Sequence, residues 1–167
     1  MNMGYFFDRI RRAVFGGKMT QKQVDGINRI IAYRDANWPK MSDAELAYLL
    51  ATVTHETAFQ MQPIKEMGNA AYFKTKRYAP DWIGRGLIQI TWKYNYVKFG
   101  IQNNPDSALT WPVALDIAYR GMIFGMFTGK KLADYIKPGK TPDFVGARRI
   151  INGTDRAKLI AGYAQSY

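Results

Sequence analysis

The feature that most constrains this chain is a helical segment that begins near Asp43 and is apolar on almost every side. Ser42 and Glu45 have the spacing of a capping box, in which a hydroxyl and a carboxylate satisfy free amide groups at a helix start. One stripe at helical spacing consists of Leu46, Leu49, Leu50 and Val53, and the other side carries Tyr48, Thr52, His55 and Phe59. Because nearly all its sides are apolar, we expect this helix to lie at the centre of the domain.

A carboxylate, Glu56, lies at the edge of the apolar stripe and near the end of this predicted helix, since the chain turns at Pro63. Burial and a helix C-terminus both favour the uncharged form of a carboxyl group, which is the form that a general acid needs. Ten residues later, Glu66 lies in a predicted loop. Inverting glycosidases use two carboxylates about 6.5–9.5 Å apart with a water between them. Spacing alone also fits a pair of ordinary solvated glutamates.

Length and composition indicate one globular domain. The chain has 167 residues, of which 47% are hydrophobic, and this is enough to bury a core. It has no cysteine, which excludes a disulfide scaffold or a thiolate metal site. With a single histidine, we expect no metal and no cofactor.

The charge balance predicts an anionic partner. Twenty-four Lys and Arg residues against thirteen Asp and Glu residues give a net charge of +11. Nucleic acid, acidic cell-wall polymer, lipopolysaccharide and anionic membrane all fit this charge. Residues 1–17 lack the pattern of a secretory signal, and the most apolar stretch, 111–128, is interrupted by charges and glycines. We therefore expect neither a signal peptide nor a transmembrane segment.

Residues 1–18 are interpreted as a basic, amphipathic N-terminal extension of the domain formed by residues 19–167. Apolar residues at helical spacing are Phe6, Phe7, Ile10 and Val14, with Arg9, Arg11 and Arg12 between them. Residues 5–15 fit contact with an anionic membrane or lipopolysaccharide. A terminal helix packed on the domain, with its arginines in water, explains the same pattern.

The remaining signals predict a mainly α fold with one short β excursion near residues 83–91. Helices are expected from the capping box of Thr20 and Gln23 to before Trp38, from Trp111 onward, from Thr141 to Asn152, and from a cap at Thr154 or Asp155 to Tyr167. Residues 68–80 are aromatic and basic without helical periodicity, so we expect a loop over a cleft. Residues 84–92 have a period of two, which is typical of a strand and places Gln89 and Thr91 on one face.

Four segments, in this order, resemble glycoside hydrolase family 19, and more narrowly its compact bacteriophage endolysins. They are residues 48–57, which include His55-Glu56-Thr57, and residues 62–66, 84–96 and 147–155. The resemblance covers residues 20–167. It implies a lysozyme-like, mainly α-helical single domain with a cleft, and an inverting hydrolysis of β-1,4-linked N-acetylated sugars.

The resemblance also implies roles for individual residues. Glu56 matches the general acid, Glu66 the general base, and Thr91 the hydroxyl that helps to hold the attacking water. The positions that match substrate-binding residues are His55, Gln89, Tyr94, Asn95 and Asn152. Trp82-Ile83 replaces the tyrosines that usually precede Gly84-Arg85-Gly86, and the disulfides and longer loops of plant members are missing.

The shortened cleft favours peptidoglycan over long chitin chains as the substrate. The expected function is therefore that of a monomeric endolysin, which accumulates in the host cytoplasm, reaches the cell wall at lysis and cleaves the glycan strands of peptidoglycan. Two alternatives stay open, a chitinase and a non-catalytic basic module that binds wall polymer or nucleic acid. The enzyme interpretation expects no nucleic-acid partner.

Overall fold

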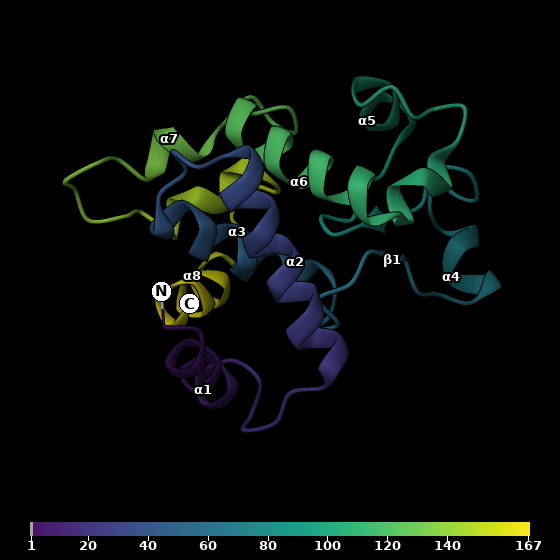
Figure 1. The fold of residues 1–167 in the computed structure, drawn as a ribbon. Coiled ribbons are helices and arrows are strands. Elements are labelled where there is room, and N and C mark those ends of the chain that lie inside the picture. The colour runs from purple at the N-terminus through teal and green to yellow at the C-terminus, as the bar shows by residue number, and fades with distance from the viewer. Residues whose placement is uncertain (1) are drawn as a thin grey trace.

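The structure, a computed structural model, describes residues 2–167 and is mainly helical (Figure 1). Its α-helices are α1 (Met3–Ala13), α2 (Gln21–Asn37), α3 (Asp43–Glu56), α4 (Ala70–Lys74), α5 (Lys93–Lys98), α6 (Trp111–Phe124), α7 (Leu132–Tyr135) and α8 (Ala157–Ser166). Two 3-10 helices are η1 (Pro105–Leu109) and η2 (Gly146–Ile150), and two strands are β1 (Ile64–Lys65) and β2 (Arg85–Gly86). The predicted fold class, mainly α with a small β element, is confirmed.

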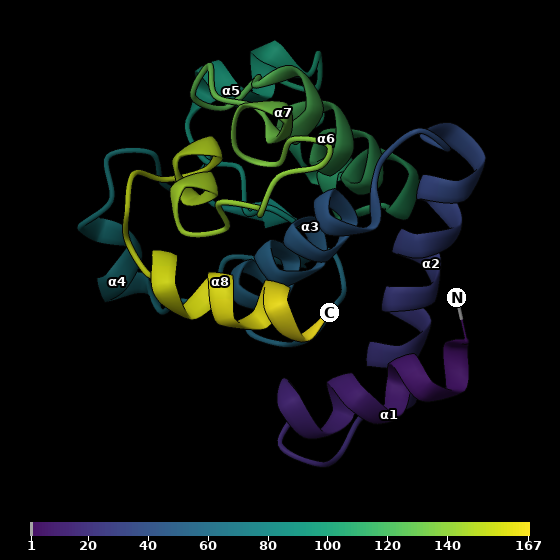
Figure 2. The same ribbon diagram turned by 90° about the vertical axis from the view of Figure 1, so that its left-hand side faces the viewer.

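Helix α3 is the central element, as its sequence predicts. Every residue from Leu46 to Thr54 is buried, and α3 contacts α2, α6 and α8. Figures 1 and 2 show α3 passing between α2 and α8. The Ser42–Glu45 capping box is present. Buried hydroxyls on α3 are satisfied within the helix, because Thr52 and Thr54 donate to the carbonyls of Tyr48 and Leu50 at 2.9 and 2.8 Å.

Helix α1 packs on the C-terminal helix. Phe6, Ile10 and Val14 are buried in the main core, and the Phe6 ring contacts the ring of Tyr167. Arg9 donates to the backbone carbonyl of Gln165 at 2.7 Å. The apolar face of α1 is thus used inside the protein. Contact of residues 5–15 with an anionic surface, and a domain boundary after residue 18, stay predictions.

The β element is shorter than the predicted strand over residues 84–92. Strands β1 and β2 pair antiparallel, with Ile64 opposite Gly86 and Lys65 opposite Arg85. A bridge between Arg85 and Ile90 then closes a tight turn. Gln89 has φ 53°, a left-handed conformation that the period-two pattern does not reveal. Gln89 and Thr91 therefore do not share one face of a regular strand.

Three further boundaries differ from the sequence-based expectations. Residues 68–80 contain α4, which Asn69 caps by accepting from the amide of Tyr72 at 2.8 Å. The predicted helix from Thr141 to Asn152 is wrong, since only η2 forms there and Asp143 accepts from the amide of Gly146 at 2.8 Å instead. Helix α8 starts at Ala157 after Arg156 in a left-handed conformation, so neither Thr154 nor Asp155 caps it. Helices α1, α2 and α6 lie where the sequence predicts them.

Within residues 2–167, no helix combines the length and the apolar character that crossing a bilayer requires.

The packing of α1 predicts a clear difference between two of its side chains. Ile10 is fully buried, whereas Tyr5 is 71% exposed. We expect Ile10→Ala to lower the free energy of unfolding by about 2–5 kcal/mol, because it leaves a cavity in the core. The matched control Tyr5→Ala should change it by less than about 0.5 kcal/mol. Urea unfolding measures both, and equal stability of the two variants would show that α1 does not pack on α8.

Candidate active site

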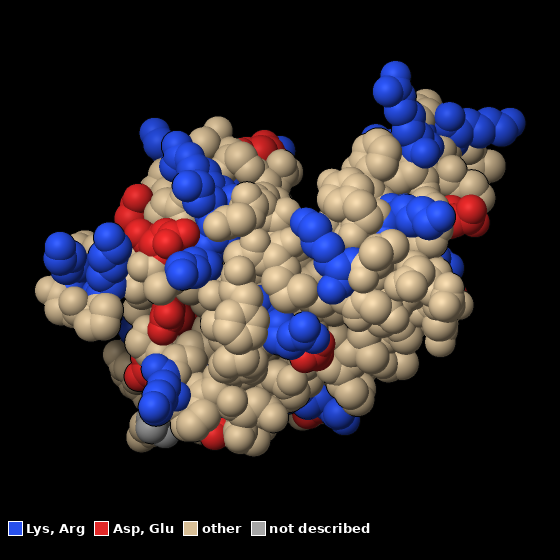
Figure 3. Space-filling model, turned by 90° about the horizontal axis from the view of Figure 1, so that it is seen from above, with Lys and Arg blue, Asp and Glu red and all other residues tan. Residues whose placement is uncertain are grey.

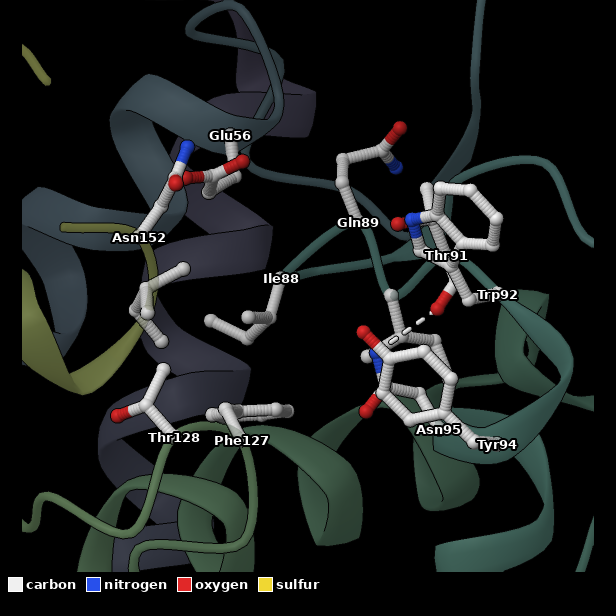
Figure 4. A pocket seen from close by; sticks show the side chains of 12 residues that line it. Glu56, Ile88, Gln89, Thr91, Trp92, Tyr94, Asn95, Phe127, Thr128 and Asn152 are labelled. Carbon is white, nitrogen blue, oxygen red and sulfur yellow. Dashed lines mark hydrogen bonds between the residues drawn. The ribbon is translucent and has the colours of Figure 1, made fainter. Parts of the chain in front are cut away.

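A cavity of about 360 Å³ lies at the C-terminal end of α3. Six of the eight predicted site residues line it, namely Glu56, Gln89, Thr91, Tyr94, Asn95 and Asn152. Figure 4 shows Glu56 and Asn152 on one side and Gln89, Thr91, Trp92, Tyr94 and Asn95 on the other, with Ile88 and Phe127 between them. The structure thus brings together side chains from four separate parts of the chain. His55 and Glu66 are not among the lining residues.

Glu56 is held by a buried arginine. Nη1 of Arg148 donates to Oε1 of Glu56 at 2.8 Å, and the side chains are 2% and 16% exposed. Nε of Arg148 donates to the carbonyl of Asp155 at 2.9 Å. A guanidinium that is removed from water requires a charged partner, so the pair fixes the position of the carboxylate. Within residues 2–167, Oε2 of Glu56 has no hydrogen-bond partner and is available to a bound molecule.

Glu66 is held by three donors. The hydroxyls of Tyr72 and Tyr78 donate to Oε1 at 2.8 and 2.9 Å, and the amide of Gly84 donates to Oε2 at 2.7 Å. Burial and the hydrogen bond to Glu66 raise the pKa of the Tyr78 phenol, so this hydroxyl stays a donor. These bonds tie the segment after β1 to the segment before β2.

Glu66 adjoins the cavity through Gly84. A Cβ atom at Gly84 would lie 2.8 Å from Oε1 of Gln89 and 3.3 Å from Oε2 of Glu66. Both side chains therefore crowd against the same glycine, and Gln89 lines the cavity. The absence of a side chain at residue 84 lets the Glu66 carboxylate approach the wall that carries Gln89 and Thr91.

The wall opposite Glu56 is fixed by side-chain hydrogen bonds to the backbone. The amide of Gln89 donates to the carbonyls of Ile64 and Gly86 at 2.8 and 3.1 Å. The amide of Asn95 donates to the carbonyl of Thr91 at 2.8 Å, which Figure 4 marks with a dashed line. Tyr94 is 57% exposed and presents its ring to the solvent side. This wall combines amides, a hydroxyl and aromatic rings, which is the composition of a site for a polar organic ligand.

His55 precedes Glu56 at the end of α3 and is half-buried. Its burial lowers the pKa of the imidazole, while the charge of Glu56 opposes that change. The imidazole is thus held neutral over a wider pH range than a histidine in water. A role for His55 in substrate binding stays a prediction.

Sequence reasoning missed two residues of this site. Arg148 lies in one of the four segments that resemble family 19, but its partner Glu56 is 92 residues away and no local pattern connects them. Trp92 lines the cavity beside Thr91 and lies in another of these segments, residues 84–96, but the resemblance assigned it no role. Its position directly after Thr91 was the signal that the sequence offered.

Comparison with known proteins supports the resemblance drawn from the sequence. No protein-family model matches the chain. It is 29% identical over 143 residues to an acidic endochitinase of Dioscorea japonica, a match that covers 74% of this chain and 55% of that protein. The fold is similar to that of chitinase C from Streptomyces griseus HUT6037, with a TM-score of 0.54, 20% identity and coverage of 97% of this chain and 88% of the other.

A second solved structure, a class IV chitinase of family 19 from Zea mays, matches with a TM-score of 0.51 and 19% identity, covering 95% of this chain and 89% of that one. This chain has the fold of these chitinases. The match covers 55% of the Dioscorea endochitinase, so this chain spans about half the length of that protein. At these identities the solved structures show the fold of the chain and not its activity.

The environment of His55 predicts a pH effect that is measurable because the chain has a single histidine. The folded protein should titrate its imidazole below the usual value of about 6.5, since burial disfavours the charged form. Below about pH 6.5 the unfolded chain then binds the proton more readily, so stability falls as the pH falls. We expect His55→Gln to reduce this pH dependence. NMR titration of the imidazole measures the pKa directly, and a midpoint at or above 6.5 would contradict this account.

Proposed function

We propose that this chain is a glycoside hydrolase that cleaves β-1,4-linked N-acetylated glycan by inversion, and that its natural glycan is bacterial peptidoglycan. The observation that carries this proposal is the Glu56 carboxylate, which faces a polar cavity while a buried Arg148 holds one of its oxygens. A carboxyl group with one fixed and one free oxygen suits proton transfer to a bound substrate, because geometry must be set before the reaction.

In the proposed reaction, Glu56 enters in its protonated form and gives that proton from its free oxygen to the glycosidic oxygen, as the bond from that oxygen to the anomeric carbon breaks. A water attacks the anomeric carbon from the opposite face and loses a proton to Glu66. The products are one chain with a new hydroxyl and one chain with an inverted reducing end. Thr91, on the wall opposite Glu56, is assigned to hold the water.

Glu66 can serve as the base through only one of its oxygens. Two tyrosine hydroxyls occupy Oε1, whereas Oε2 accepts a single bond, from Gly84. Oε2 is also the atom that lies near the Gly84 position next to Gln89. We therefore assign the proton transfer from water to Oε2.

The charge of the protein supports peptidoglycan as the substrate. Peptidoglycan carries carboxylates, and chitin is uncharged. Figure 3 shows Lys and Arg side chains on both sides of a hollow in the surface, with fewer Asp and Glu side chains on the same face. With a net charge of +11, the protein attracts an acidic polymer over a long range. The endolysin role, release from the host cytoplasm at lysis and a monomeric state form part of this proposal.

Chitin is the second candidate substrate. The relative from Dioscorea japonica is named an endochitinase and the similar solved structures are named chitinases. A non-catalytic basic module is the third candidate, and it predicts binding without bond cleavage.

The arginines of α1 offer a further contact with an anionic partner, although Arg9 and Arg11 already bind Gln165 and Asp8.

The substitution Glu56→Gln separates an enzyme from a binding module. We expect it to reduce glycan cleavage by roughly 10²–10⁴-fold while polymer binding is retained, because the amide keeps the shape but cannot donate the acidic proton. Purified peptidoglycan and colloidal chitin are tested in parallel, with Tm as the control for folding. Cleavage within about threefold of wild type would remove Glu56 from the mechanism, and cleavage of chitin alone would exclude the endolysin role.

The substitution Glu66→Gly tests the base. We expect loss of hydrolysis, and restoration of turnover by azide with formation of a glycosyl azide of inverted configuration, since azide needs no base. Tyr72→Phe with Tyr78→Phe is the comparison variant: it loosens the same loop but keeps the carboxylate, so hydrolysis should fall less than in Glu66→Gly and azide should not restore it. A retained azide product would contradict inversion, and unchanged hydrolysis in Glu66→Gln would place the base elsewhere.

A further inference from the structure

Trp92 is an exposed aromatic residue in a concave site. Its side chain is 40% exposed and lines the cavity immediately after Thr91. Figure 4 shows its ring standing beside Thr91 on the wall that faces Glu56. A large apolar side chain that remains exposed within a cavity loses the benefit of burial until a ligand covers it. The position of Trp92 thus points to a ligand with an apolar face.

The backbone at Trp92 is strained. Its φ and ψ are 68° and 138°, a region that glycine adopts readily and a bulky residue rarely adopts. Two backbone hydrogen bonds hold this conformation, from the Trp92 amide to the Trp82 carbonyl and from the Asn95 amide to the Trp92 carbonyl, both 3.0 Å long. Glycine would satisfy the backbone at lower cost. The backbone therefore does not require an indole at this position, and the side chain has a role other than stabilising the fold.

The indole also contacts Tyr78, one of the residues that hold Glu66. The rings of Trp92 and Tyr78 meet edge to face, with centroids 5.3 Å apart and planes at 69°. The hydroxyl of Tyr78 donates to Oε1 of Glu66 at 2.9 Å. A ligand that packs on the indole therefore also restricts the Tyr78 ring, whose hydroxyl binds the Glu66 carboxylate.

We propose that Trp92 is a substrate-positioning residue, against which a sugar ring packs its apolar face and through which the bound sugar fixes Tyr78 and Glu66. This rests on the proposed function for the class of ligand. A pyranose of the N-acetylglucosamine type has its substituents around the rim of the ring and C–H groups on its faces. Such a face fits a flat indole, while the amides of Gln89 and Asn95 lie on the same wall for polar groups.

The test measures oligosaccharide binding in a Glu56→Gln background, in which cleavage does not interfere. Chitin and peptidoglycan oligosaccharides are titrated by calorimetry into this parent, Trp92→Gly, Trp92→Phe and Phe124→Ala. Phe124 is the matched control, because it is 59% exposed and does not line the cavity. We expect Trp92→Gly to weaken binding at least tenfold, Trp92→Phe to recover most of that loss, and Phe124→Ala to bind like the parent.

Stability separates this role from a structural one. Glycine relieves the positive φ and loses only a partly exposed ring, so Tm of Trp92→Gly should stay within about 3 °C of the parent. In the active enzyme, Tyr78→Phe keeps the ring contact and removes the bond to Glu66, so kcat should fall while KM stays within about twofold.

Each contrary outcome has one meaning. If the parent binds oligosaccharide and Trp92→Gly binds it within about twofold, Trp92 does not position the substrate and the proposed function is unaffected. A fall in Tm of more than about 8 °C in Trp92→Gly would show that the ring has a structural role instead. If the parent binds neither oligosaccharide, the proposed function is wrong and this inference fails with it.

Discussion

The buried ion pair between Glu56 and Arg148 is the interaction on which the candidate active site depends. Arg148 is almost fully buried and joins the end of α3 to η2, 92 residues away, and its Nε also binds the carbonyl of Asp155 before α8. One side chain thus fixes three segments on one side of the cavity. An unpaired buried charge would destabilise the folded protein. The Arg148 guanidinium therefore holds the Glu56 carboxylate in place, and the carboxylate in turn stabilises the fold around Arg148.

A second buried arginine organises the opposite wall. Arg85 is 5% exposed and bonds to Asp106, to the hydroxyl of Tyr96 and to the carbonyl of Ile83. These bonds hold the turn that carries Gln89 and Thr91, where the two strands are too short to do so. The cavity therefore lies between two walls, each fixed by one arginine that water hardly reaches. This arrangement preorganises the site before a substrate arrives.

The sequence predicts the parts of the fold that local chemistry determines. The capping boxes at Thr20 and Ser42 and the apolar periodicity locate α2 and α3, because these signals act within one helix. The helix expected from Thr141 fails, since a hydroxyl followed by proline is also compatible with the loop that precedes η2. The turn at Gln89 could not be predicted, because the alternation of residue types along this segment is the same whether or not Gln89 has a positive φ. Six site residues meet at one cavity, but Arg148 could not be predicted, since only the tertiary fold brings it to Glu56.

A double-mutant cycle on the ion pair tests the central claim most directly. Glu56→Gln, Arg148→Met and the double variant are compared by kcat/KM on glycan, with Tm measured for each. If Arg148 acts on the reaction only by holding Glu56, all three variants should lose activity to a similar extent, roughly 10²–10⁴-fold, and the losses should not add. Losses that add in the double variant, or an Arg148→Met enzyme within about threefold of wild type, would contradict the account.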